Sequence, residues 1–428
     1  MRKILFIVGL FVFTSVQAQV KTLREQATII NEVLKDRLNN VLPVLMDKAQ
    51  IDCWVLITRE YNEDPIVKTM LPAEWLSARR RTILVFFRNH QNNTIEKYAV
   101  ARYAVGTEIT AAWDVAAYPN QWEALTALLR KLNPTKIAIN TSTDYGHADG
   151  LDHTEYLEFM QSLTTTEQAK VISAEPLAVS WLETRTEKEM QLYPLLLQIT
   201  HAIIKEGFSN KVIHPNVTTT QDLVWWFRQQ LSNKGLSTWF HPSIEIQRRV
   251  SNESDEVIRP GDFLHVDFGI SYLRLNSDVQ EQAYVLLPNE KEVPQDLQAA
   301  FTKTNQLQDF LTNEFEVGKS GNQILKQALT KAKAAGIQPS IYTHPIGFHG
   351  HAAGTTIGMW DMQNGVPGSG DYTMKAKTCY SIELNATHTL TGWDKPVRVA
   401  LEQNGYFNGN SFEYIDGRQT KIHLIQSK

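Results

Sequence analysis

The sequence predicts an α+β protein that is built from two domains. The chain has 428 residues, of which about 410 remain after an N-terminal leader, and this length is sufficient for two domains. Helical and strand-like hydrophobic periodicities alternate through residues 20–175, whereas strands and loops dominate after residue 340. We therefore predict an α/β N-terminal domain over residues 19–176 and a larger domain with a mainly antiparallel sheet over residues 177–428.

The leader is typical of a secretory signal peptide over residues 1–18. A short basic start, Met1-Arg2-Lys3, precedes an apolar run from Ile4 to Phe13 and a small-residue segment that ends at Ala18. The apolar run is short for a membrane span, no later segment is long and apolar enough, and no cysteine is available for a lipid anchor. We expect a secreted protein without a membrane anchor, most consistent with a bacterial periplasm.

Composition excludes several functional classes. A net charge of −4 gives no basic surface for nucleic acid, and 43% hydrophobic with 21% charged residues is ordinary globular chemistry. The two cysteines, Cys53 and Cys379, exclude a disulfide scaffold. Two separate buried thiols are favoured over a single interdomain bridge.

Within the N-terminal domain, the first predicted element is a long helix over residues 22–48. A second helix, over residues 121–132, ends before Pro134. Strand-like runs are expected at residues 53–58, 82–87 and 136–139. No His, Asp, Glu or Cys residues cluster here at metal-ligand spacing.

The second domain begins with a helix that is marked by a capping box. Thr186 and Glu189 form this box, and the helix can reach Gly207 with Pro194 as a candidate kink. The remaining predicted helices cover residues 221–233, 296–315 and 322–335, and the predicted strands cover residues 238–246, 378–384, 397–401 and 421–425.

Two aspartates, Asp267 and Asp278, are the most informative residues of this domain. They are eleven positions apart in a segment whose apolar and polar residues alternate as in two paired strands. In a hairpin both carboxylates can point from the same face. Buried carboxylates repel each other and resist ionisation unless a cation neutralises them. The pair therefore indicates either a metal site or two unrelated exposed acids.

Further candidate residues follow towards the C-terminus. His344, His349 and His351 lie within eight residues among glycines, although a loop with one packed and two solvated histidines is an equal alternative. Glu383 and Glu402 lie in apolar strand-like segments, where a buried carboxylate needs a partner. For either glutamate alone, a structural salt bridge is the simpler interpretation.

Taken together, four carboxylates and one imidazole favour a metal site over isolated acids. The set consists of Asp267, Asp278, His344, Glu383 and Glu402. Such ligands suit two divalent ions such as Mn, Co or Zn. Two ions that share bridging carboxylates would hold a water, lower its pKa and stabilise a tetrahedral intermediate. The residues thus predict a dimetal hydrolase site.

The order and local spacing of these residues resemble the creatinase/methionine aminopeptidase superfamily of M24-type metallopeptidases, and most closely its aminopeptidase P and prolidase branch. The resemblance covers the C-terminal domain by motif and the N-terminal domain only by layout. It implies a pita-bread fold for residues 177–428, a creatinase-N-like domain before it, and hydrolysis of Xaa-Pro peptide bonds. It also implies manganese as the favoured metal and a possible homodimer, since this family often forms dimers.

The resemblance assigns a role to each ligand. Asp267 would bind one metal through both oxygens, and Asp278 and Glu402 would bridge the two metals. His344 and Glu383 would bind only the second metal.

The resemblance also implies catalytic roles. Glu383 would contact the attacking water as the general base. His351, seven residues after His344, matches a histidine that contacts substrate and stabilises the intermediate. His349 has no counterpart and is expected to be a supporting loop residue.

Two departures from the family pattern affect the substrate site. The family usually has a histidine about twenty residues before its first aspartate, but the segment from residue 245 to 253 has none. His241, Arg248 and Arg249 are the candidates to replace it. The usual Glu-Pro after the fourth ligand reads Glu383-Leu-Asn here. We therefore expect an intact metal site and a modified substrate site.

Three functions are compatible with these observations. An Xaa-Pro-type metallopeptidase is favoured by the complete ligand set. A creatinase-type hydrolase of another C–N bond is disfavoured, because metal-free relatives lose the ligands that are present here. A binding protein that kept the fold without turnover is the third alternative.

Overall fold

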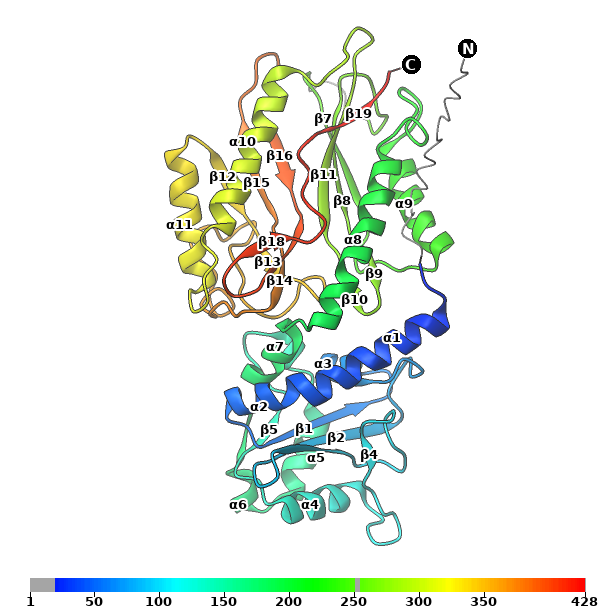
Figure 1. Ribbon diagram of the computed structural model, residues 1–428, viewed down its shortest axis with the longest axis vertical. Coiled ribbons are helices and arrows are strands. Elements are labelled where there is room, and N and C mark those ends of the chain that lie inside the picture. Colours follow the sequence, from blue (N-terminus) through cyan, green and yellow to red (C-terminus); the bar gives the residue numbers. More distant parts are fainter. Residues whose placement is uncertain (1–19, 251–254, 428) are drawn as a thin grey trace, which may run out of the picture.

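The computed structural model describes residues 20–250 and 255–427 and arranges them in two lobes (Figure 1). The lower lobe in this view contains the elements from α1 to α7, and the upper lobe contains those from α8 to β19. The predicted signal peptide, residues 1–18, lies outside the described residues.

The N-terminal lobe is a mixed six-stranded sheet with helices on both faces. Its strand order is β4-β3-β2-β1-β5-β6. The strands are β1 (Cys53–Arg59), β2 (Arg81–Asn89), β3 (Thr94–Ala99), β4 (Thr110–Ala111), β5 (Ile137–Ile139) and β6 (Val171–Ser173). The helices are α1 (Leu23–Asp36), η1 (Arg37–Val41), α2 (Leu42–Ala49), α3 (Pro65–Met70), α4 (Gln121–Leu132), η2 (Gly146–Ala148), α5 (His153–Ser162), α6 (Thr165–Gln168) and α7 (Glu175–Glu183).

Side-chain alternation along β1 explains the two layers of helices. Trp54 and Leu56 pack in the core that includes residues of α2 and α7. Cys53, Val55 and Ile57 pack in the core on the other face, with residues of α4 and α5. Both faces of the central strand are therefore buried. The predicted boundary between residues 176 and 177 falls inside α7, whose side chains pack in the first of these cores.

The predicted helix over residues 22–48 is interrupted in the structure. A five-residue π-helical segment, η1, separates α1 from α2. Pro43 stands at the start of α2 and has no backbone N–H to donate to the preceding turn. Within η1, Arg37 is fully buried and turned towards the second lobe. The hydrophobic residues between positions 22 and 48 follow a helical period throughout, so the π-helical segment was not predicted.

The C-terminal lobe contains three sheets of three or four strands each, plus a short hairpin. The strand orders are β19-β11-β8-β7, β12-β15-β16, β13-β14-β17-β18 and β10-β9. The helices are α8 (Glu187–Gly207), α9 (Thr220–Lys234), α10 (Gln295–Thr312) and α11 (Gly321–Ala334). The strands are β7 (Ser243–Gln247), β8 (Phe263–Phe268), β9 (Ser271–Tyr272), β10 (Leu275–Asn276), β11 (Val279–Val285), β12 (Gln338–Ile341), β13 (His344–Pro345), β14 (Thr378–Ser381), β15 (Leu384–His388), β16 (Val397–Leu401), β17 (Asn404–Phe407), β18 (Phe412–Tyr414) and β19 (His423–Ile425).

In this lobe the strands lie between two pairs of helices, with α8 and α9 on one side and α10 and α11 on the other (Figure 1). Every strand pair in its sheets is antiparallel except β11 with β19. The predicted α+β class with a mainly antiparallel C-terminal sheet is therefore confirmed. The capping box of Thr186 and Glu189 is present, and Pro194 lies inside α8.

Two predicted strands differ from the structure. The strand expected over residues 238–246 begins only at Ser243. Before it, the Thr238 hydroxyl lies 2.8 Å from the carbonyl oxygen of Phe240 and 2.7 Å from that of Gly269, and shares its one hydrogen between them. The strand expected over residues 378–384 divides into β14 and β15, which pair in different sheets. Glu383 lies where the chain crosses between these sheets.

The cysteines and the lengths of the helices are also described by the structure. Cys53 and Cys379 are both free and buried, as predicted. Among the described residues, no helix combines the length and apolarity that a membrane span requires.

Candidate metal centre

The five predicted ligands come from strand ends that meet between the sheets of the C-terminal lobe. Along β8, Leu264, Val266 and Phe268 pack in the core that includes residues of α8 and α9. The alternation of side chains therefore turns Asp267 to the opposite face of the sheet. Asp278 immediately precedes β11, which pairs antiparallel with β8, so the predicted Asp267/Asp278 hairpin is confirmed.

The remaining three ligands are brought to the same place by the other two sheets. His344 opens β13, Glu383 lies between β14 and β15, and Glu402 follows β16. A backbone bridge between Gln280 and Glu402 joins the end of β16 to β11. Long-range pairing thus places residues 135 positions apart in sequence, Asp267 and Glu402, in one cluster.

Within this cluster the ligand atoms form two overlapping groups. Asp267, Asp278 and Glu402 make one group, and His344, Glu383 and Glu402 make the other. In each group the candidate atoms lie within 4.8 Å of one another. Glu402 belongs to both groups, which is the geometry expected of a bridging carboxylate. Asp278, His344 and His351 form a further group of the same kind.

Buried atoms without hydrogen-bond partners show that these residues fit divalent cations. Asp267 Oδ1, Asp278 Oδ1 and His344 Nε2 are buried and have no hydrogen-bond partner. The other ring nitrogen of His344, Nδ1, lies 3.0 Å from the carbonyl oxygen of Pro345. Nδ1 therefore carries the proton, and the Nε2 lone pair is directed at the carboxylates, 3.5 Å from Glu402 Oε1.

The pKa values of the candidate ligands also indicate a site for cations. Burial, followed by the charge of Glu402, raises the pKa of Asp267 to about 7, and burial raises the pKa of Glu402 to about 7. Burial and the neighbouring carboxylates raise the pKa values of Asp278 and Glu383 well above their ordinary range. Four carboxylates in this space resist simultaneous ionisation unless cations neutralise them. Burial lowers the pKa of His344 and keeps its imidazole neutral, the form that binds metal.

Polar residues that were not predicted hold the carboxylates in place. The Ser381 hydroxyl donates to Glu402 Oε1 at 2.6 Å. Asn404 accepts from the backbone N–H of Asp278 at 3.0 Å and donates to Ser381 Oγ at 2.9 Å. Gln280 donates to both Glu383 and Glu402.

His351 lies at the edge of the cluster. It is exposed on one side, and its ring centroid is 4.6 Å from that of His344 and 5.0 Å from that of Trp239. Burial, followed by the charges of His344 and His147, lowers its pKa to about 4, so the ring is neutral at pH 7. This placement agrees with a residue that contacts substrate, a role that stays a prediction.

His349 contacts the other lobe instead. Its ring stacks on His147 of η2 with centroids 4.1 Å apart, and burial lowers its pKa to about 3. No sequence pattern connects His147 with this loop, because the contact depends on how the two lobes pack.

The three residues proposed to replace the missing histidine contact residues outside the ligand cluster. His241 is exposed and contacts Arg228 and Trp225. Arg248 forms an ion pair with Asp262, and Arg249 lies 4.0 Å from Glu290. None of these contacts involves a residue of the ligand cluster, and the replacement of the histidine by one of the three stays a prediction. Residues 251–254 of this segment lie outside the described part of the chain. Trp239 and Tyr342, which the sequence did not single out, are aromatic neighbours of His351.

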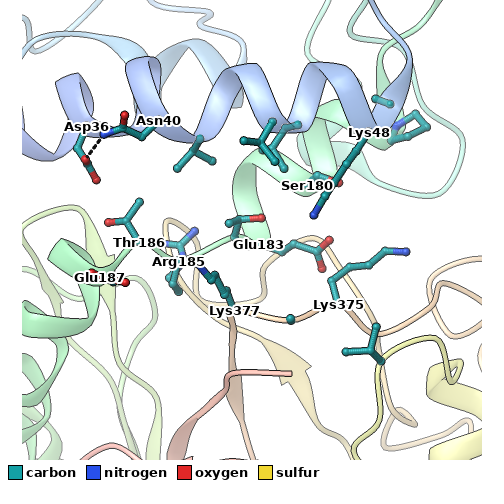
Figure 2. Close-up of a pocket in the computed structure, with 18 of the residues that line it drawn as sticks. Asp36, Asn40, Lys48, Ser180, Glu183, Arg185, Thr186, Glu187, Lys375 and Lys377 are labelled. Atoms are coloured by element: carbon teal, nitrogen blue, oxygen red, sulfur yellow. Dashed lines mark hydrogen bonds between the residues drawn. The ribbon is translucent and has the colours of Figure 1, made fainter. Parts of the chain in front are cut away.

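A cavity of about 870 Å³ opens between the lobes, and none of the five ligands lines it. Its walls come from α2, α7 and residues 372–377 and include several lysines (Figure 2). Glu183 is buried at this junction, between the helix that carries Lys48 and the segment that carries Lys375 (Figure 2). The metal cluster and this cavity are therefore separate features.

Comparison with protein families identifies the C-terminal lobe. The model of metallopeptidase family M24 matches residues 196–410, which is half of the chain and includes all five predicted ligands. The chain belongs to metallopeptidase family M24. It is therefore a hydrolase of a family that uses divalent metals, as the sequence predicted. No curated protein matches the sequence significantly.

Solved structures with the same fold span both lobes of this M24 protein. An X-Pro aminopeptidase from Thermotoga maritima MSB8 has a TM-score of 0.63 at 12% identity, over 89% of this chain and 99% of that one. An Xaa-Pro dipeptidase from Bacillus anthracis has a TM-score of 0.57 at 14% identity, over 94% and 100%. The prolidase from Pyrococcus horikoshii OT3 has a TM-score of 0.55 at 14% identity, over 92% and 99%. These similarities confirm the pita-bread fold.

Proposed function

We propose that this M24 protein is a dinuclear metallopeptidase that hydrolyses Xaa-Pro peptide bonds as an aminopeptidase or dipeptidase. The observation that carries the proposal is the pair of overlapping ligand groups that share Glu402. Three buried ligand atoms in these groups have no hydrogen-bond partner. The Xaa-Pro specificity is supported by the names of structures with the same fold, which are X-Pro aminopeptidases, Xaa-Pro dipeptidases and prolidases.

The residues divide into ligands for two ions, for which manganese is the favoured metal and Co or Zn are alternatives. Asp267, Asp278 and Glu402 would hold one ion, and His344, Glu383 and Glu402 the other, with Asp278 also close enough to serve both. When bound, the ions lower the pKa of a water and polarise the peptide carbonyl.

Side chains of the protein then manage the proton and the substrate. Glu383, with one oxygen fixed by Gln280, accepts a proton from the attacking water and delivers it to the leaving nitrogen. The neutral ring of His351, exposed beside His344, donates a hydrogen bond to the carbonyl oxygen as negative charge develops there. Trp239 and Tyr342 flank His351 and limit the substrate groups that fit beside it.

A peptide library in Mn²⁺ buffer tests the proposal. Peptides of two to five residues, with and without proline at the second position, are incubated with the protein, and cleavage sites are read by mass spectrometry. We expect hydrolysis of the bond that precedes proline. Equal cleavage without proline would refute the Xaa-Pro specificity. No cleavage by a protein that carries both ions would refute the peptidase and favour a binding protein.

A further inference from the structure

Gln280 of β11 places its amide between two of the candidate ligands. The side chain is 2% exposed. Its Nε2 donates to Glu402 Oε2 at 2.7 Å and to Glu383 Oε1 at 3.0 Å. An amide nitrogen has two hydrogens, and here each has a different carboxylate as its acceptor. One neutral side chain thus fixes the separation of two acids that would otherwise repel.

The orientation of this amide is supported by a second residue. Gln280 Oε1 lies 2.8 Å from Nε2 of His265, which is buried on the neighbouring strand β8. Because a carbonyl oxygen only accepts hydrogen bonds, His265 donates from Nε2. A flipped amide would direct its oxygen at two carboxylates and its NH₂ group at a donor. The two carboxylates require the NH₂ group on their side, and a His265 that donates from Nε2 supports the same orientation from the other side of the amide.

Backbone hydrogen bonds between Gln280 and Glu402 fix the positions of these two residues relative to each other. The backbone N–H of Gln280 donates to the carbonyl oxygen of Glu402 at 3.0 Å, and that of Glu402 donates to Gln280 at 3.3 Å. Ser381 donates to the other oxygen of Glu402. Both oxygens of Glu402 are therefore held by neutral donors, and each retains lone-pair capacity for a cation. A lysine at position 280 would instead neutralise the carboxylates and compete with the ions.

We propose that Gln280 is a positioning residue, which holds Glu383 and Glu402 in the geometry that binds the ions, and that His265 supports its amide from the opposite side. The inference rests on the proposed dinuclear function and deepens it. Hydrogen-bond partners that orient ligands change metal affinity by about 10- to 100-fold when they are removed. Neither Gln280 nor His265 is itself a ligand, so the number of ions bound at saturation should be retained.

The test compares two glutamines of the same strand. Gln280→Met keeps the length of the side chain and removes its donors. Gln282→Met is the matched control, because Gln282 is fully buried and its amide donates to the carbonyl oxygen of Ala400. Mn²⁺ dissociation constants are measured by calorimetry on metal-stripped full-length proteins, and thermal unfolding is recorded for each. Gln280→Leu serves as the second variant if Gln280→Met does not fold.

We expect Mn²⁺ affinity to fall by about 10- to 100-fold in Gln280→Met and to stay within about twofold of wild type in Gln282→Met. Three outcomes would overturn the inference alone: unchanged affinity in Gln280→Met, tighter binding because the amide competes with the ions, or equal losses in both variants. A wild-type protein that binds no Mn²⁺ would overturn the inference together with the proposed function.

Discussion

Glu402 occupies the central position of the site because it belongs to both ligand groups. It is 1% exposed, and its oxygens are held by Ser381 on one side and Gln280 on the other. Glu383 is held by Gln280 through one oxygen only. This difference agrees with a bridging role for Glu402 and a role in proton transfer for Glu383.

A substitution at Glu383 tests its catalytic role. Glu383→Gln keeps the size of the side chain but removes the proton acceptor, so we expect a folded protein whose kcat falls by at least about 100-fold. The measurement is kcat on the best peptide from the library, with thermal unfolding recorded in parallel. Activity equal to that of wild type would show that Glu383 is not the general base.

Residue types and order were sufficient to predict that the five candidate ligands lie together, because acids and a histidine in apolar strands need a compensating partner. The supporting residues were not predicted, although Gln280, Ser381 and Asn404 each stand two positions from a ligand. In extended backbone at the end of a strand, that spacing can place two side chains on one face. A search for polar residues two positions from each ligand would have found them. The candidates for the missing histidine, in contrast, depended on tertiary contacts that no local pattern encodes.

At the scale of elements, the loop after β13 is fixed from both sides. Asn276 donates to the carbonyl oxygen of Gly347 from its backbone at 2.9 Å and from its side chain at 3.0 Å. Gly350 packs against the indole of Trp239 so closely that an added Cβ would lie 2.2 Å from the ring. The position of His351, the next residue, therefore depends on the absence of a side chain at position 350.

Gly350→Ala tests this dependence. We expect the added methyl group to displace Trp239 or the loop that carries His351, and kcat/KM to fall by about tenfold or more, since small displacements of catalytic groups have large effects. Mn²⁺ binding should be unchanged, because the ligands lie outside the loop. Gly146→Ala is the control, since no atom lies within 4 Å of its added Cβ. Equal kcat/KM in wild type and Gly350→Ala would contradict this account.

The helices and strands that were predicted best are those whose ends are determined by neighbouring residues in the sequence. The helix over residues 121–132 and the strand over residues 397–401 have the predicted bounds. The segment over residues 378–384 was predicted as one strand because its residues favour strands throughout. Its division at Glu383 arises from pairing with two different sheets, and sequence periodicity contains no information about that pairing.

At the scale of the whole molecule, the lobes are joined by a buried charge network. Arg37 of η1 and Arg185 both pair with Glu189, at 2.8 Å and 3.0 Å, and all three are at most 1% exposed. Both guanidinium groups also lie within 5 Å of the ring of Phe348, in the loop that carries His351. The N-terminal lobe thus contributes to the position of the loop that carries His351, a relation that the sequence could not show.

Glu183 at the lobe junction (Figure 2) makes stability depend on pH. Its Oε1 accepts from the Tyr372 hydroxyl at 2.9 Å, its Oε2 has no hydrogen-bond partner, and burial raises its pKa to about 8. Folding favours the protonated form, so this contribution to stability is complete below the unfolded-state pKa near 4.5 and is lost as the pH rises through 8.

Glu183→Gln should remove this dependence. Between pH 6 and pH 9, we expect the free energy of unfolding of wild type to fall by about 3 kcal/mol relative to that of Glu183→Gln. Urea unfolding at both pH values measures the difference, and the comparison cancels the titration of all other groups. Parallel pH profiles for the two proteins would show that Glu183 is ionised in the folded state.

The central claim, a dinuclear centre that is shared through Glu402, is tested most directly by metal stoichiometry. The full-length protein is stripped with EDTA, dialysed to equilibrium against Mn²⁺ at pH 8, and analysed for metal and protein content. We predict two Mn²⁺ ions per chain at saturation. A plateau of one ion per chain would contradict the dinuclear centre, and no bound ion would contradict the metal site itself.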